Sequence, residues 1–437
     1  MHNQWLAFYV SSHGFGHMTR CLAIIEEFLE TTEHLIYLAS GTYQNSFARF
    51  YLKRFGDRIV FKDLCTEVGL VNKQNSLQVD IPQLKQELND FMAGWDMAVA
   101  EEVAFLSDLP VACVISAISV IGIQVGERLG VRNIGIANFT WCEQYEHLGL
   151  SETLIARFRE VYAKLDLLIE YDLMLPTHDL DVPRKQVGFI CRRFDSDRIA
   201  AIKKQYGPSI FITCGKSANL DTIQVDNYEG TIFATSGINI TATANATVVH
   251  LPVETFDTHN YLAASDTIIA KAGWGTISEA LLSKRNLVLI EREGVLEDTE
   301  NIEELKRRGV AVSIKESNLA RIDMQAINEL IAENIVREHL DAYHNAMGDI
   351  IRALWYASRF SLTMFSAIKS LIACISMRSR SDSLIETATP RRFSSSMFSV
   401  SSNTPSLSIS TKFRFESSAS DIVPHPAFAM TMSLAAR

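Results

Sequence analysis

Residues 6–30 read LAFYVSSHGFGHMTRCLAIIEEFLE and predict a strand, a glycine-rich turn and a helix. Residues 6–10 form a short apolar run typical of a buried strand, and residues 18–30 carry apolar side chains at helical spacing. Such a unit directs free backbone N–H groups and the positive end of a helix dipole to the carboxyl edge of a sheet. We therefore expect a ligand at the turn, residues 11–17.

The turn itself holds two glycines and two histidines. Gly14 and Gly16 let the backbone approach a ligand without a Cβ clash. The turn is not the dinucleotide-binding fingerprint or a P-loop, because neither the third glycine nor the lysine of those motifs follows. His13 and His17 offer a base with a near-neutral pKa. A plainer interpretation, in which the glycines only make a tight turn and the histidines cap the helix, remains open.

Short apolar runs alternate with helical segments as far as residue 355, which predicts an α/β protein with parallel sheets covered on both faces. We expect two doubly wound, Rossmann-like domains, residues 1–183 and 195–355, joined by a polar and basic linker, residues 184–194. The expected strands are residues 6–10, 35–39, 111–115, 131–137, 167–169, 209–213, 231–234, 247–251, 267–270, 287–290 and 310–314.

The last segment, residues 356–437, differs in composition. It has 21 serines and no glycine, although the chain has 21 glycines, and its nine Lys and Arg outnumber its four Asp and Glu. One interpretation is a serine-rich disordered tail. The interpretation that we prefer is that this segment is not selected protein sequence, and we assign no function to it.

The composition limits the partners and the compartment. A net charge of −10 argues against a broad electrostatic contact with nucleic acid. Seven scattered cysteines without a CxxC pair argue against a disulfide framework or zinc site and fit a reducing cytoplasm. We expect no signal peptide and no transmembrane segment, because the apolar runs are only strand-sized. Peripheral association with a membrane remains open.

A second glycine turn occurs within residues 265–282, SDTIIAKAGWGTISEALL. After a strand that ends near Lys271, the turn begins at Gly273. The amides of Trp274, Gly275 and Thr276 would point from a helix N-terminus toward an anion such as a diphosphate.

Glu279 lies one turn into the same helix, where its carboxylate can accept hydrogen bonds from the hydroxyls of a ribose. Alternatively, Thr276 and Glu279 form only a capping box. The two interpretations can hold together. Farther along, residues 291–293 look like a solvated loop.

This second turn resembles the donor-binding motif of GT-B glycosyltransferases of the MurG-like kind. The resemblance implies that Gly273, Trp274, Gly275 and Thr276 hold a nucleotide diphosphate and that Glu279 holds the ribose. It also implies that Asp298 and Asn301 contact the donor sugar, although the family's usual glutamine is absent.

Two further donor-binding residues are expected, Thr255 from the same resemblance and Gly215 from its place after an expected strand. Thr255 ends a stretch, residues 251–255, that falls where family members contact the base through backbone groups. Gly215 lies in a loop after an expected strand, residues 209–213, where it either touches phosphate or forms a simple turn.

The first turn resembles the Gly-His-x-x-Pro loop of the same family, with Arg20 in place of the proline. Its form, with Gly14 and Gly16, is similar to the glycosyltransferase-like region of plant L-arabinokinases. By resemblance, Gly14, Gly16 and Arg20 lie on the acceptor side of a cleft. His17 is then the first choice for a catalytic base and His13 the second.

Together these likenesses imply a GT-B fold and a glycosyltransferase of the hexosyltransferase type. The donor would be a nucleotide sugar, a UDP-sugar, bound by residues 195–355, and the acceptor an unidentified hydroxyl compound on residues 1–183, with a lipid-linked sugar or a polysaccharide among the candidates. No Asp-x-Asp pair stands at a strand end, so we expect neither a metal nor another cofactor. Two alternatives remain: a catalytically silent nucleotide-sugar-binding module, and a nucleotide-sugar epimerase or hydrolase on the same fold.

Overall fold

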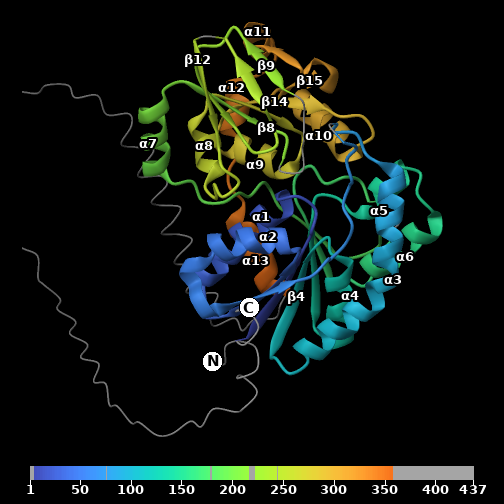
Figure 1. Cartoon of the computed structure of the whole chain (residues 1–437). Helices are drawn as coiled ribbons and strands as arrows, with labels where there is room; N and C mark the ends of the chain where they lie inside the picture. The colour runs from blue at the N-terminus through green and yellow to red at the C-terminus, as the bar shows by residue number, and fades with distance from the viewer. Residues whose placement is uncertain (1–3, 75, 178–179, 216–221, 244, 358–437) are drawn as a thin grey trace, which may run out of the picture. The chain divides into compact units, whose positions relative to one another are not determined.

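The computed structural model describes residues 4–357, except residues 75, 178–179, 216–221 and 244. The described part contains two larger parallel sheets, one built mainly from the first half of the chain and one from the second (Figure 1). The serine-rich segment predicted for residues 356–437 lies outside the described residues, except for its first two.

The first sheet has seven strands, all parallel to their neighbours. Its order is the one expected of a doubly wound, Rossmann-like sheet, with a topological switch point between β1 and β4. From edge to edge the strands are β3 (Ile59–Asp63), β2 (Leu35–Ser40), β1 (Trp5–Val10), β4 (Val111–Ala117), β5 (Arg132–Ala137), β6 (Leu167–Glu170) and β7 (Arg184–Gln186).

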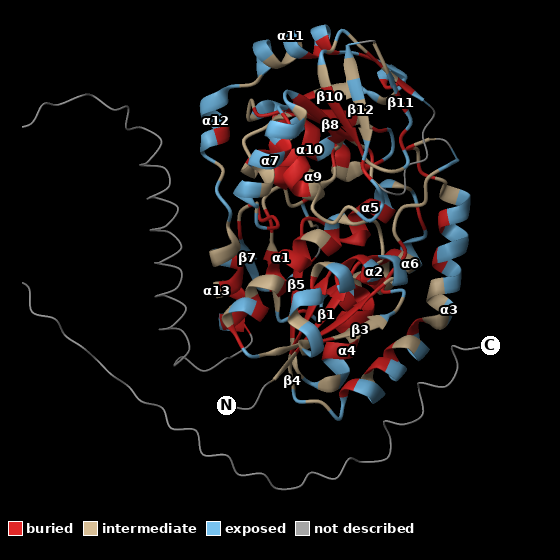
Figure 2. Ribbon diagram, turned by 60° about the vertical axis from the view of Figure 1, so that its left-hand side comes forward, coloured by how far each residue is buried: buried red, intermediate tan, exposed pale blue. Residues whose placement is uncertain are grey.

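Helices cover both faces of this sheet, so its strands are apolar on both sides. In β1, Phe8 faces a core shared with α1 (Gly16–Thr31), whereas Tyr9 faces a core shared with α3 (Ile81–Leu106). Figure 2 shows the sheet buried between these layers. The other helices of this half are α2 (Thr42–Tyr51), α4 (Val120–Leu129), α5 (Trp141–His147) and α6 (Glu152–Tyr162), with a 3-10 turn η1 (Lys53–Arg58).

The second sheet has six parallel strands, and a smaller parallel sheet packs against one of its faces. The six strands are β12 (Ala246–His250), β10 (Gly230–Ala234), β8 (Ser209–Thr213), β13 (Thr267–Lys271), β14 (Asn286–Glu291) and β15 (Val312–Lys315). The smaller sheet is β11 (Ile240–Ala242), β9 (Ile223–Asp226) and β16 (Arg321–Asp323). The helices of this half are α7 (Ser196–Tyr206), α8 (Thr258–Ala264), α9 (Trp274–Leu282), α10 (Leu296–Arg307), α11 (Met324–Asn334) and α12 (Arg337–Asp341), with a 3-10 turn η2 (Glu316–Asn318).

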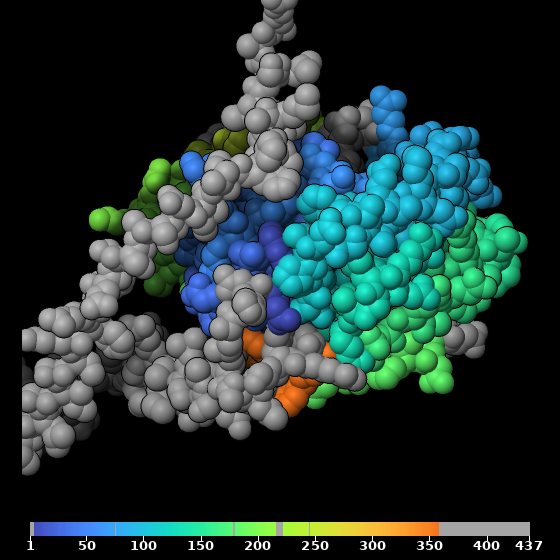
Figure 3. All heavy atoms as spheres, turned by 90° about the horizontal axis from the view of Figure 1, so that it is seen from below, coloured from blue at the N-terminus to red at the C-terminus, as the bar shows by residue number. Residues whose placement is uncertain are grey.

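Two segments differ from the predicted division of the chain. Within the predicted linker, β7 pairs with β6 at the edge of the first sheet, so the connection between the halves starts after Gln186. The final helix, α13 (Met347–Ala357), packs on α1, β5 and β6 of the first half. Figure 3 shows its orange atoms among the blue and green atoms of that half. The helix returns because Ile350 and Leu354 bury their side chains in the core around α1.

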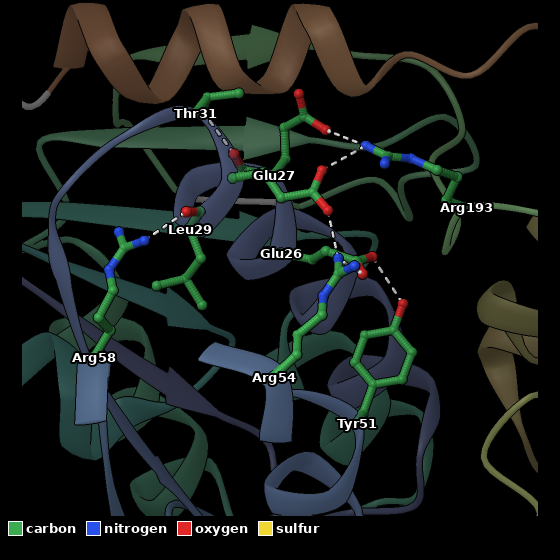
Figure 4. A network of polar contacts seen from close by, with 9 residues as sticks. Glu26, Glu27, Leu29, Thr31, Tyr51, Arg54, Arg58 and Arg193 are labelled. Atoms are coloured by element: carbon green, nitrogen blue, oxygen red, sulfur yellow. Dashed lines mark hydrogen bonds and ion pairs between the residues drawn. The ribbon is translucent and has the colours of Figure 1, made fainter. Parts of the chain in front are cut away.

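An ion-pair network ties the connection back to α1. Arg193 reaches Glu27 at 3.3 Å, and both residues are labelled in Figure 4. Arg193 also pairs with Glu30 at 2.9 Å, and Arg54 pairs with the same carboxylate. Arg193 is 60% exposed, so these pairs contribute little to stability.

No helix in the described part of the chain is long and apolar enough to cross a membrane. The six cysteines within that part form no disulfide, and all but Cys65 are buried.

Candidate functional site

A pocket lies between the two halves, at the carboxyl ends of strands from both larger sheets. Turns that follow β1, β5, β8, β13 and β14 all contribute lining residues. Open parallel sheets bind ligands at this edge. Twelve of the fourteen site residues suggested by the sequence line this one pocket: His13, Gly14, Gly16, His17, Arg20, Gly215, Thr255, Gly273, Trp274, Gly275, Thr276 and Glu279.

The first turn is held from below by α2 and by a buried carboxylate. Gly14 has φ +60°, a conformation that favours glycine. The Gln44 side-chain amide donates to the carbonyl oxygens of Ser12 at 2.6 Å and Gly14 at 3.0 Å. The Ser12 N–H donates to Oε1 of Glu67 at 2.8 Å. Three hydrogen bonds and the backbone conformation of Gly14 thus fix the turn before α1 begins.

The helices that follow the two turns both begin without a side-chain cap. Phe15 precedes α1 and Gly273 precedes α9, and neither helix has an acidic residue in its first turn. The first backbone N–H groups of both helices therefore remain available to donate hydrogen bonds, at the positive end of each helix dipole. Both ends border the pocket.

Glu279 does not form the capping box considered from the sequence. Its Oε1 accepts from Nε of Arg192 at 3.2 Å and from a terminal nitrogen of Arg192 at 2.8 Å. Arg192 also donates to the carbonyl oxygen of Phe256 at 2.8 Å. Since Arg192 is buried, it fixes both the glutamate and the loop that contains Thr255.

The side chain of Trp274 belongs to the core. Its indole N–H donates to the carbonyl oxygen of Asp172 at 2.7 Å, and its ring packs against Tyr171 and Phe189. This leaves the backbone amide of Trp274 as the group that can serve a ligand.

The two glycine turns touch. A Cβ on Gly275 would lie 3.3 Å from Cα of Gly16 and 3.6 Å from Oγ1 of Thr19. The first turns of α1 and α9 therefore meet at the pocket, one from each half of the chain.

His17 is 7% exposed, and its Nδ1 lies in hydrogen-bond contact with the Arg20 guanidinium. Burial, and then the charge of Arg20, lower the pKa of His17 well below its usual value. His17 is consequently a neutral imidazole at physiological pH.

His13 packs tightly on Gly69, where a Cβ would lie 2.0 Å from Cγ of the imidazole. Burial, followed by the charges of Lys271 and Arg292, lowers the pKa of His13 to about 3. His13 therefore faces two cations of the second half while remaining neutral itself.

Arg20 links the first turn to α10. One terminal nitrogen donates to Oδ1 of Asn138 at 2.6 Å, and the Asn138 amide donates to Oε1 of Glu297 at 2.9 Å. The guanidinium carbon also lies 5.1 Å from the ring centroids of both Tyr171 and Trp274, within cation–π range. Burial raises the pKa of Glu297, which also lines the pocket.

Three pocket cations were not singled out from the sequence: Arg192, Lys271 and Arg292. Lys271 ends β13 and Arg292 directly follows β14. A basic residue at the carboxyl end of a parallel strand lies where such sheets bind ligands, and this position could have identified both residues from the sequence. Arg192 lies in the predicted linker, residues 184–194, and its place in the pocket follows only from its contact with Glu279, 87 positions away.

The prediction of a solvated loop at residues 291–293 was wrong for Arg292, because this side chain is buried. It donates from Nε to Oδ2 of Asp298 at 2.5 Å and from a terminal nitrogen to Oδ1 at 2.7 Å. Asp298 is therefore used inside the protein and does not line the pocket.

Asn301 is also absent from the pocket lining. Its amide donates to the carbonyl oxygen of Ala272 at 3.0 Å and supports the second turn from behind. In α10 the side chain that reaches the pocket is Glu297, one residue earlier than Asp298. Helical periodicity explains the shift, because adjacent residues of a helix point about 100° apart.

Among the described residues, no group of three or more His, Cys, Asp or Glu is arranged to hold a metal ion.

No protein-family model matches the sequence. The chain is 22% identical over 303 residues to L-arabinokinase from Arabidopsis thaliana, which covers 66% of this chain and 28% of that protein. It is 22% identical over 372 residues to a protein from Methanosarcina mazei named an uncharacterized glycosyltransferase, which covers 76% of this chain and 90% of that protein. The chain thus spans under a third of the first relative and most of the second.

Among solved structures, the chain resembles Phytolacca americana UGT2 complexed with UDP-2fluoro-glucose and pterostilbene. The TM-score is 0.56 at 10% identity, with 82% of this chain and all of that chain covered. Two doubly wound halves with their strand ends at one pocket agree with this likeness. The chain therefore has the GT-B fold of glycosyltransferases, as the sequence predicted.

Proposed function

We propose that the chain is a glycosyltransferase of the hexosyltransferase type that moves a sugar from a UDP-sugar to a hydroxyl acceptor. The observation that carries the proposal is the contact between Gly16 and Gly275, where two helices present uncapped N-termini to one pocket. An anionic ligand is the natural partner of two such ends. A donor diphosphate supplies that anion.

In this proposal the diphosphate lies on the amides of residues 274–276 and beside Lys271. A Cβ on Gly215 would lie 3.1 Å from Nζ of Lys271, so a glycine there leaves room for phosphate next to the amine. The second oxygen of Glu279 accepts from the ribose, and the backbone around Thr255 contacts the base. Lys271 and the amides balance the charge of the leaving diphosphate, so the reaction needs no metal.

In the transfer step, the acceptor oxygen forms a bond to C1 of the sugar while the bond from C1 to the phosphate oxygen breaks. The electron pair leaves with UDP, and the acceptor proton passes to a histidine of the first turn. We assign this base to His13 rather than His17, because Nδ1 of His17 is already engaged by Arg20. Burial is the largest cause of the low pKa of His13, and a bound diphosphate offsets the further lowering by Lys271 and Arg292, so the pKa of His13 rises when the donor binds.

A second candidate is a nucleotide-sugar-binding module without turnover. The low pKa values of His13 and His17 favour it, since neither imidazole is a strong base before a ligand binds. An assay of UDP release from UDP-sugars, with and without EDTA, separates the two candidates. We expect release that EDTA leaves unchanged, whereas tight UDP binding without release on any acceptor favours the module.

The donor class is tested by thermal shift of the full chain with UDP, ADP, GDP and CDP. We expect UDP to raise the unfolding temperature most. Glu279→Gln should reduce this shift and Glu279→Ala should abolish it, because the ribose contact is weakened or lost. Glu303→Gln, at an exposed position on α10, is the matched control and should behave like the unchanged chain. No shift with any nucleotide contradicts the proposal.

A further inference from the structure

We infer that His17 acts as a fixed hydrogen-bond donor to a phosphate oxygen of the donor, and that Arg20 is the positioning residue that holds it in this role. The inference rests on the proposed function for the identity of the ligand. In this inference His17 is a hydrogen-bond donor and not the base suggested by the sequence, and Arg20 is the residue that orients its ring.

The direction of the hydrogen bond follows from the chemistry of the partners. The guanidinium of Arg20 carries only N–H donors and no acceptor. Nδ1 of His17, which contacts it, must therefore be the acceptor and carry no hydrogen. A neutral imidazole has one N–H, so that hydrogen lies on Nε2. Nε2 can then donate a hydrogen bond, but it has no lone pair with which to take a proton.

The arginine is held so that it cannot release the imidazole easily. Arg20 is 3% exposed, and its other terminal nitrogen donates to Asn138. Its guanidinium carbon also lies 5.1 Å from the ring centroids of Tyr171 and Trp274, which pack against each other. The contacts with Asn138 and with the two rings hold the guanidinium in place, so that its N–H stays directed at Nδ1 of His17 and keeps the imidazole in one tautomer.

The position of His17 selects the ligand. His17 directly follows Gly16 in the first turn of α1, and Gly16 touches Gly275 in the first turn of α9. Hydrogen-bond donors thus surround one pocket: the ring Nε2–H of His17 and the free backbone amides at the starts of α1 and α9. An oxygen of the donor diphosphate satisfies them together.

The direct test compares His17→Gln with His17→Ala in UDP binding by titration calorimetry. Glutamine retains an N–H donor near the position of Nε2 but cannot accept a proton as a base. We expect His17→Gln to bind UDP within about threefold of the unchanged chain and His17→Ala to bind at least about tenfold more weakly. His147→Gln, at an exposed position on α5, is the control. Unchanged UDP affinity in His17→Ala overturns the inference.

Arg20 is tested with a pair of variants that differ in hydrogen-bonding capacity. Arg20→Gln keeps a donor toward Nδ1, and Arg20→Met fills similar space without one. We expect UDP affinity to fall about tenfold in Arg20→Met and to be largely retained in Arg20→Gln, with folding checked by the thermal unfolding temperature. Equal losses in both variants would assign Arg20 to packing alone and overturn its positioning role.

The nitrogen-15 chemical shifts of His17 provide a readout that needs no nucleotide. We expect one protonated ring nitrogen, Nε2, and one unprotonated nitrogen, Nδ1, with signals assigned by their loss in His17→Gln. Arg20→Met should release this fixed tautomer into a mixture. A hydrogen on Nδ1 in the unchanged chain overturns the inference even if UDP binds. Absence of UDP binding with the expected tautomer instead overturns the proposed ligand.

Discussion

Gly275 of α9 lies directly against Gly16 of α1, and a Cβ on Gly275 would stand 3.3 Å from Cα and 3.5 Å from the carbonyl oxygen of Gly16. Because neither residue has a side chain, the first turns of the two helices approach with only backbone between them. The two halves of the pocket are thereby brought within reach of one small anion.

Gly275→Ala tests this approach. The added Cβ meets backbone, which cannot swing aside as a flexible side chain can, so the two helix ends must separate slightly. We expect UDP affinity to fall about tenfold, with a larger loss in Gly275→Val. Gly94→Ala is the matched control, because a Cβ there meets nothing within 4 Å in α3 and should add about 0.5–1 kcal/mol of stability. Unchanged UDP affinity in Gly275→Val contradicts the prediction.

Arg192 and Arg193 are adjacent but have opposite surroundings. Arg192 is buried in its pair with Glu279, whereas Arg193 pairs with Glu27 and Glu30 at the surface. Arg192→Met leaves a buried carboxylate without its partner and should cost about 3–5 kcal/mol of unfolding free energy. Arg193→Met should cost at most about 1 kcal/mol. Urea unfolding measures both, and similar costs for the two variants would be inconsistent with this view.

Asp298 is expected to support the fold and not to contact the donor sugar. Asp298→Asn leaves Arg292 without its buried counter-charge, which should cost about 3–5 kcal/mol. Glu303→Gln on the same helix should change stability by under about 0.5 kcal/mol, because it is exposed. A variant of normal unfolding temperature with a raised KM for the donor would instead return Asp298 to the sugar site.

Glu67 should make stability depend on pH. Burial raises the pKa of this carboxyl from 4.5 to about 7. Between those pH values the folded chain keeps a proton that the unfolded chain has lost, so the unfolding free energy falls as the pH rises through the window. Glu67→Gln removes this contribution, and its stability relative to the unchanged chain should improve by about 1–3 kcal/mol from pH 4.5 to 7.

Urea unfolding at several pH values measures the Glu67 effect. Glu87→Gln, at an exposed position on α3, is the control and should follow the unchanged chain at every pH. A Glu67→Gln variant with the same pH dependence as the unchanged chain would rule out a raised pKa for Glu67.

Most strands of the two larger sheets were predicted because they are short apolar runs next to helices of clear period, as β1 and α1 show. In the first sheet β3 and β7 were not predicted, and the three residues of β7, Arg-Lys-Gln, are all exposed and carry no apolar signal. The smaller sheet was not predicted, because β9, β11 and β16 have only three or four residues each. Such short strands carry no readable period, and they form because the second sheet offers them an apolar face. The long helix α3 was also not predicted from the sequence.

At the site, glycine turns after strands were the readable signal for most of the twelve pocket residues, whereas Thr255 came from the family resemblance. The partners of those residues were not readable. Arg192 reaches Glu279 across 87 positions, and Asn138 reaches Glu297 across 159. Pairings of this kind depend on how the two halves meet, which local sequence does not encode. The direction of the Arg20–His17 hydrogen bond likewise needed coordinates.

The central claim is that the meeting point of α1 and α9 binds a nucleoside diphosphate through its phosphates. Titration calorimetry of the full chain with UDP, UMP and uridine tests it most directly. The account predicts that UDP binds at least about tenfold more tightly than UMP and that uridine binds more weakly still, because each lost phosphate leaves helix-end amides and Lys271 without a partner. Equal affinity for the three compounds, or no binding of UDP, would contradict it.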